Sequence, residues 1–107
     1  GQLCVKHDVL ILSDEIHGDI VYAPQKFIHI ASIDDSIAAR TLTFIAPSKT
    51  FNIAGLSTSV SIVPNPVLNQ RLQEEYAKMH ADQGNIFGAV ALEAAYTMSG
   101  SNSCCNI

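Results

Sequence analysis

Two runs of consecutive apolar residues predict buried strands. Residues 9–13 and 41–45 are apolar or β-branched nearly throughout, which is typical of strands covered on both faces in a parallel sheet. Residues 57–63 alternate serine and threonine with valine and isoleucine, and they predict a third strand. Residues 27–33 are apolar but fit no single element, and 34–36 read as a turn.

Three other stretches have helical features. Residues 1–7 read as the end of a helix. Asn65 and Pro66 make a typical helix start, with the asparagine as cap and the proline in the first turn. Apolar side chains then recur at helical spacing over 66–79, and a second helix, rich in small residues, covers 86–98. This order of elements predicts an α/β fold with mostly parallel strand pairing.

Two charged residues follow the first two predicted strands. Asp14 comes directly after the first run, and Lys49 comes shortly after the second. Because parallel strands end at the same edge of a sheet, and ligands bind outside that edge, we expect the carboxylate and the amine to lie together. This pair suits pyridoxal 5′-phosphate (PLP). A lysine forms a Schiff base with the cofactor aldehyde, and a carboxylate holds a proton on the pyridine nitrogen.

The same segments carry a family resemblance. SDEIHGDIVY (residues 13–22) and APSKTFNIAGL (residues 46–56), in this order and spacing, resemble the fold-type-I PLP enzymes, and within them most the MalY/PatB group of cystathionine β-lyase-like aminotransferases. The resemblance implies that residues 1–98 belong to the large cofactor-binding domain, a three-layer α/β/α structure with a mostly parallel sheet. Residues 99–107 depart from the family pattern, and we predict that they form a disordered or artefactual tail.

The resemblance also implies roles for four residues. Lys49 would carry the cofactor and be catalytic, and Asp14 would pair with the pyridinium nitrogen. Ser48 could donate a hydrogen bond to a phosphate oxygen. His17 matches a position where related enzymes often have a tyrosine that contacts the phenolic oxygen of the cofactor. Plainer interpretations stay open: a solvated lysine, a loop-capping aspartate, a capping serine and a surface histidine.

Two positions depart from the family pattern. Many class I aminotransferases have a phosphate-binding arginine eight residues after the lysine, where this chain has Ser57. They often have a hydroxyl residue three before the lysine, where this chain has Ala46. Phosphate binding should therefore depend on residues outside this segment, and we expect the chain by itself to be inactive.

The resemblance favours a PLP-dependent carbon–sulfur β-lyase that acts on cystathionine or cysteine-like substrates. An amino acid aminotransferase of class I/II remains the alternative, because the two reactions share their early steps and no residue here separates them. In either case the expected partners are an amino acid substrate and, for the full-length protein, a second copy in a homodimer.

Composition and charge narrow the other possibilities. The chain has 107 residues, a length typical of one domain, and its net charge of −4 without a basic stripe argues against nucleic acid binding. No apolar run reaches the roughly 18 residues that a membrane span needs. The three cysteines, Cys4, Cys104 and Cys105, match neither a disulfide framework nor a zinc site. We therefore expect a cytoplasmic protein, and the absence of an initiating methionine suggests a fragment.

Two interpretations from other classes remain. Asp14, His17 and Asp19 could bind a divalent metal in a hydrolase, although this would leave the segment 46–52 unexplained. Alternatively, the chain could be a non-catalytic α/β module that associates through the helix predicted over 86–98. The main interpretation includes no metal site.

Overall fold

The computed structural model describes residues 1–81 and 84–99, and its centre is a three-stranded sheet. The strands β1 (Ile11–Asp14), β2 (Thr41–Ile45) and β3 (Val60–Ile62) lie in the order β1-β2-β3. β1 runs parallel to β2, and β3 runs antiparallel to it. The α/β class predicted from the sequence is confirmed.

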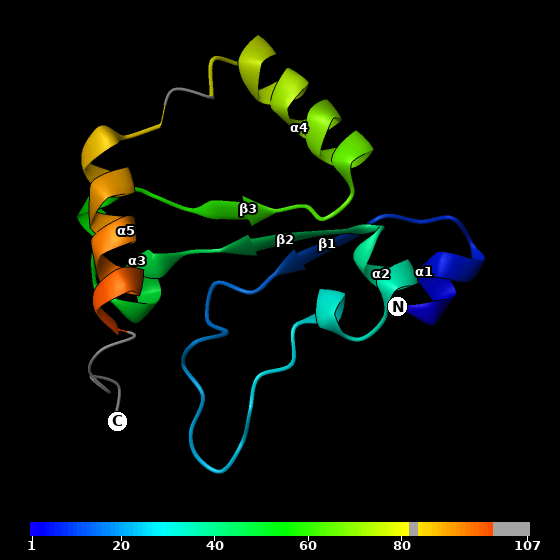
Figure 1. Ribbon diagram of the computed structural model, residues 1–107, viewed down its shortest axis with the longest axis horizontal. Coiled ribbons are helices and arrows are strands. Elements are labelled where there is room, and N and C mark those ends of the chain that lie inside the picture. Colours follow the sequence, from blue (N-terminus) through cyan, green and yellow to red (C-terminus); the bar gives the residue numbers. More distant parts are fainter. Residues whose placement is uncertain (82–83, 100–107) are drawn as a thin grey trace.

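The direction of β3 differs from the mostly parallel pairing that we expected. Parallel strands need a crossover connection that carries the chain back to the starting end of the sheet. Here the connection from β2 consists of the one-turn helix α3 (Pro47–Thr50) and the 3₁₀ helix η2 (Ala54–Leu56). Neither is long enough to cross the sheet, so β3 starts at the end where β2 stops and runs back beside it (Figure 1).

The longer helices begin and end close to their predicted limits. α1 covers Gln2–Lys6, α4 covers Pro66–Lys78 and α5 covers Ile86–Ser99. Ser99, which was predicted to begin the tail, is instead the last residue of α5, and the rest of the predicted tail, residues 100–107, lies outside the described residues.

A short helix replaces the predicted turn at residues 34–36. α2 spans Asp35–Ala38, and the side chain of Asp34 caps it by accepting a hydrogen bond from the Ser36 N–H at 2.8 Å. The ambiguous segment 27–33 contains the 3₁₀ helix η1 (Ile30–Ser32). Both elements depend on local hydrogen bonds, which hydrophobic periodicity does not reveal.

Different helices lie at the two ends of the sheet. In Figure 1, β1 and β2 point to the same side, where α3 and α5 lie and where the long loop after β1 leaves the sheet. α1 and α2 lie beyond the opposite end. The carboxyl ends of β1 and β2 therefore share one edge with α3, α5 and that loop.

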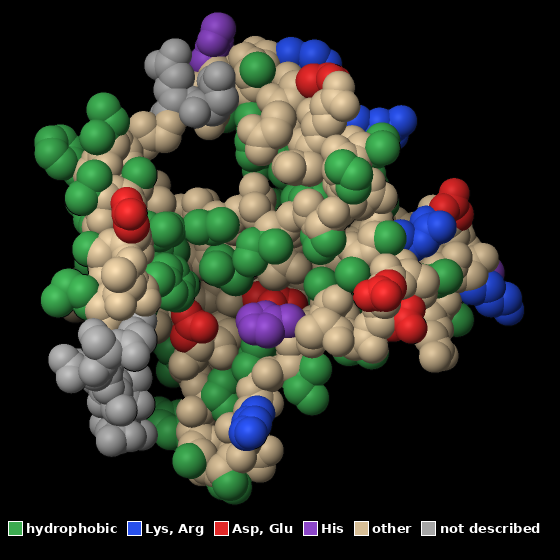
Figure 2. All heavy atoms as spheres, viewed as in Figure 1, with side chains coloured by type: hydrophobic (Ala, Val, Ile, Leu, Met, Phe, Trp, Pro, Cys, Tyr) green, Lys and Arg blue, Asp and Glu red, His purple; other side chains and the backbone are tan. Residues whose placement is uncertain are grey.

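The described part of the chain is thin and has a small core. It measures 41 × 40 × 19 Å along its principal axes. Thr41 and Pro47 are fully buried, and Ile11 and Ile37 are the large apolar side chains that are buried among the described residues. α4 buries none of its residues. Figure 2 shows apolar side chains gathered over the sheet and around α5, so much of the apolar surface is open to further packing.

Candidate active site

Lys49 is carried by the single turn of α3. Pro47 occupies the first turn, where its fixed φ suits a helix and its missing N–H costs nothing, and its side chain is buried. The backbone of α3 is closed by a hydrogen bond from the Phe51 N–H to the Pro47 carbonyl at 2.8 Å. The Lys49 side chain is exposed, and within residues 1–81 and 84–99 no carboxylate pairs with its amine.

Asp14 is the last residue of β1 and lies at the same edge. It is opposite Phe44 of β2, five positions before Lys49 in the chain. Its carboxylate is exposed, and Oδ1 accepts a hydrogen bond from the Ile16 N–H at 3.3 Å. The parallel register therefore brings Asp14 and the turn that carries Lys49 to one edge of the sheet, and Asp14 also caps the loop that follows it.

His17 and Ser48 lie in the same region. His17 is exposed in the turn after β1, and it lines a cavity of about 400 Å³ together with Asp14 and Phe27. Ser48 is half-buried in the first turn of α3, directly before Lys49. The four predicted residues thus come from two segments that meet at the carboxyl end of the parallel strand pair.

Glu15 forms a buried network that the sequence analysis missed. Its side chain is 6% exposed and accepts hydrogen bonds from Ser13 Oγ at 2.8 Å, His29 Nδ1 at 2.5 Å and the Ile30 N–H at 3.3 Å. Burial raises the pKa of Glu15, but the hydrogen bonds from His29, Ser13 and Ile30 and the charge of His29 outweigh it and hold the pKa below its usual value.

This network attaches the loop to the sheet edge. The Glu15 N–H donates to the Phe44 carbonyl at 2.9 Å, so the residue after Asp14 continues the pairing with β2. The alternation of side chains along a strand could have revealed that Glu15 is buried. Ile11, Ser13 and Glu15 share one face of the strand and alternate with the exposed Leu12 and Asp14.

Asp19 contacts the turn that carries Lys49. Its Oδ2 accepts a hydrogen bond from Thr50 Oγ1 at 2.9 Å. Within the described ranges, no three histidine, cysteine or acidic side chains gather as a metal site would require. The arrangement therefore gives no support to a metal hydrolase built on Asp14, His17 and Asp19.

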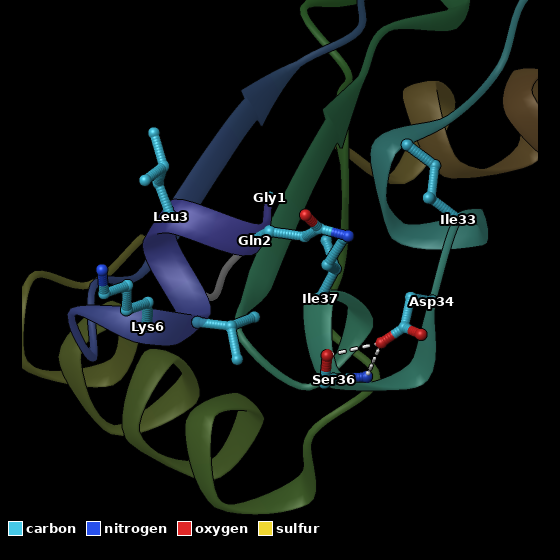
Figure 3. Close-up of a pocket in the computed structure, with 9 residues that line it drawn as sticks. Gly1, Gln2, Leu3, Lys6, Ile33, Asp34, Ser36 and Ile37 are labelled. Carbon is cyan, nitrogen blue, oxygen red and sulfur yellow. Dashed lines mark hydrogen bonds between the residues drawn. The ribbon is translucent and has the colours of Figure 1, made fainter.

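A second cavity lies at the far end of the sheet. It has a volume of about 750 Å³ and lies between α1 and the segment that leads into α2. Figure 3 shows Leu3 and Lys6 of α1 on one side and Ile37 and Asp34 on the other. None of the predicted site residues lines this cavity, which is therefore separate from the candidate site.

Comparison with known proteins gives the family. The model of the aminotransferase class I and II family matches residues 1–95, and the chain belongs to this family. Cystathionine β-lyase PatB of Bacillus subtilis (strain 168) is 39% identical over 94% of this chain and 26% of its own length. An asparagine–oxo-acid transaminase of Streptococcus mutans is 32% identical over 79% of this chain and 25% of its own length.

Solved structures agree with this assignment. A PLP-bound protein of Clostridium difficile 630, described as an aminotransferase, superposes with a TM-score of 0.87 at 40% identity, over 94% of this chain and 26% of that protein. Cystalysin of Treponema denticola, which contains PLP, superposes with a TM-score of 0.80 at 36% identity, over 94% of this chain and 25% of that protein. The expected fold-type-I architecture is confirmed, and the chain spans about a quarter of the length of these relatives.

Among the described residues, no helix is both long enough and apolar enough to cross a bilayer.

Proposed function

We propose that this chain is the part of a PLP-dependent enzyme that binds the cofactor through Lys49. The observation that carries the proposal is that Asp14 and the turn that carries Lys49 follow the carboxyl ends of the parallel strands β1 and β2, at one edge of the sheet. Membership of the aminotransferase class I and II family supports it. The activity we propose for the whole enzyme is carbon–sulfur β-elimination on cystathionine or cysteine-like substrates.

The residues at this edge fit the cofactor. PLP needs an amine for its aldehyde and a negative charge beside its ring nitrogen. The Lys49 amine is exposed and has no carboxylate partner in the described part of the chain. The Asp14 carboxylate is exposed and accepts one weak backbone hydrogen bond, which leaves acceptor positions for the ring N–H.

Each of the four site residues would contact a different part of the cofactor. When bound, PLP supplies an electron sink for breaking a bond at the α-carbon of the substrate. Lys49 would hold the cofactor through its aldehyde carbon, and Asp14 would keep a proton on the ring nitrogen, because a nearby negative charge favours the protonated ring. Ser48 would donate a hydrogen bond to a phosphate oxygen, and His17 would donate one to the phenolic oxygen.

The choice between two reactions of the family rests on the relatives. PatB, a lyase, matches more of this chain and at higher identity than the transaminase of Streptococcus mutans does. We therefore infer β-elimination as the reaction and keep amino acid transamination as the second candidate. A homodimer and a cytoplasmic location also remain proposals, which rest on the family resemblance and on the cysteine content respectively.

The reaction can be tested with the full-length protein, PLP and cystathionine. A β-lyase releases pyruvate and ammonia in equal amounts without any added 2-oxo acid, and this is the result we expect. Product formation that requires an added 2-oxo acid would instead establish a transaminase. Lys49→Ala should abolish either activity, and Lys26→Ala, which removes an exposed lysine from the loop after β1, serves as the matched control.

A further inference from the structure

The helix that carries Lys49 is too short to hold its own position. α3 has four residues, a single turn, and an isolated turn of helix is not stable in water. The exposed side chain of Lys49 cannot anchor the turn either. The orientation of α3 must therefore come from contacts with other segments.

One such contact converges on Asp19. Its Oδ2 accepts hydrogen bonds from Thr50 Oγ1 at 2.9 Å and from the Tyr96 hydroxyl at 3.3 Å. Thr50 is the residue after Lys49 and the last residue of α3, whereas Tyr96 belongs to α5. A single carboxylate oxygen thus joins the loop after β1, the lysine-bearing turn and a helix far along the chain.

Aromatic packing reinforces the same junction. The rings of Phe51 and Tyr96 pack edge to face, with centroids 5.2 Å apart and planes inclined at 83°. Phe51 caps the carboxyl end of α3, and Figure 1 shows α3 and α5 beside each other. Burial, followed by the charge of Asp19 and its hydrogen bond, raises the pKa of Tyr96, so the phenol stays protonated and remains a donor.

From these contacts we propose that Asp19 is a positioning residue for Lys49, which acts through Thr50 and Tyr96. The inference rests on the proposed function, in which Lys49 binds PLP. The loop that holds Asp19 begins directly after Asp14, so one segment sets the place of both the ring-nitrogen partner and the lysine. A carboxylate suits this role because one of its oxygens can accept two hydroxyl donors at once.

The position of a reacting group has a large effect on rate. A displacement of about 1 Å can slow a reaction by roughly a hundredfold. Loss of the Thr50 hydrogen bond would let the turn of α3 pivot on the buried Pro47 and would spread the Lys49 amine over many positions. The expected consequence is slower bond formation between Lys49 and the cofactor, with little change in overall folding.

The test uses full-length protein freed of cofactor and then mixed with excess PLP. Samples are quenched with borohydride at intervals, and the pyridoxyl label on Lys49 is quantified by peptide mapping. Three variants remove parts of the junction: Asp19→Ala, Thr50→Val and Tyr96→Phe. Thr50→Ser restores the hydroxyl, and Thr97→Val is the matched control, an exposed threonine beside Tyr96 for which the structure records no side-chain hydrogen bond in the described ranges. Thermal unfolding of each cofactor-free variant is measured in parallel.

We expect Thr50→Val and Asp19→Ala to slow labelling of Lys49 by about tenfold to a hundredfold, and Tyr96→Phe to slow it less. Thr50→Ser and Thr97→Val should stay within about twofold of the wild-type rate. Labelling at the wild-type rate in all three junction variants would overturn the positioning role, even where the melting temperature falls. A wild-type protein that takes no label on Lys49 would overturn the proposed function itself, and the positioning role with it.

Discussion

Asp14 and Glu15 are neighbours in the chain, but their carboxylates have opposite surroundings. Asp14 is exposed at the sheet edge and accepts one hydrogen bond at 3.3 Å. Glu15 is buried and accepts three, from Ser13, His29 and Ile30. Because successive side chains of a strand point to opposite faces, one carboxylate is free for a ligand while the next anchors the loop.

Replacing Asp14 should reduce turnover far more than it reduces cofactor binding. In the full-length protein, Asp14→Asn would remove the negative charge that we propose to lie beside the ring nitrogen, and it would keep the size of the side chain. We expect turnover to fall by about a hundredfold or more, as it does when an enzyme loses one electrostatic partner of the reacting group. Cofactor occupancy, measured by absorbance, should stay nearly unchanged. Near-normal turnover would show that Asp14 serves only as a loop cap.

Glu15→Gln should destabilise the full-length protein in a pH-dependent way. The pKa of Glu15 lies below its ordinary value of 4.5, so its charge stabilises the folded state above that value, and the contribution is lost as the pH falls through the lowered pKa. At about pH 7 we expect a cost of about 1–3 kcal/mol in the free energy of unfolding. Glu93→Gln, at an exposed site on α5, is the control. A cost that stays constant down to acid pH would contradict this role.

The sequence could predict that Asp14 and Lys49 follow strands ending at one edge of the sheet, because this position depends on a simple rule about parallel strand ends. It could not identify the partners of Glu15 and Asp19. His29 lies 14 residues from Glu15, and Thr50 lies 31 residues from Asp19, so these contacts depend on how the loop after β1 folds back. The roles of all four predicted site residues stay predictions: Lys49, Asp14, Ser48 and His17.

At the scale of elements, predictability follows the range of the interactions. The start of α4 was clear because its signals, Asn65 and Pro66, act on the residues next to them. The direction of β3 could not be predicted from the sequence, because it depends on the path of the chain through α3 and η2. The sequence did not predict α2, because its four residues are too few to show the hydrophobic periodicity of a helix.

Removing the cap of α4 should weaken two contacts at once. Asn65 Oδ1 accepts from the Val67 N–H at 2.9 Å, and Nδ2 donates to the Ala39 carbonyl at 2.9 Å, which ties α4 to the end of α2. We expect Asn65→Ala to lower the free energy of unfolding of the full-length protein by about 1–2 kcal/mol. Asn69→Ala, on the exposed face of α4, should change it by less than about 0.5 kcal/mol in urea unfolding. Equal effects of the two substitutions would contradict the capping role.

At the scale of the molecule, the described chain has more apolar surface than it covers. Leu12 is 70% exposed and Phe87 is 76% exposed, and both belong to elements that should be covered on at least one side. β1 and β3 are the outer strands of the sheet, and each leaves one row of backbone groups without a strand partner among the described residues. Relatives about four times as long have the additional chain to cover such surfaces.

The 107-residue chain alone should therefore neither bind PLP tightly nor behave as a well-packed monomer. We expect self-association in sedimentation experiments and rapid hydrogen exchange at the amides of all three strands, because little packing protects them. A monodisperse monomer with slowly exchanging strands would show that the segment folds as an autonomous domain.

The most direct test of the central claim is to locate the cofactor on the chain. The full-length protein is incubated with PLP and reduced with borohydride, and the modified peptide is identified by mass spectrometry. The placement of α3 at the carboxyl end of β1 and β2 predicts a pyridoxyl group on Lys49. A label on Lys26 or Lys78 instead, with Lys49 unmodified, would contradict the account.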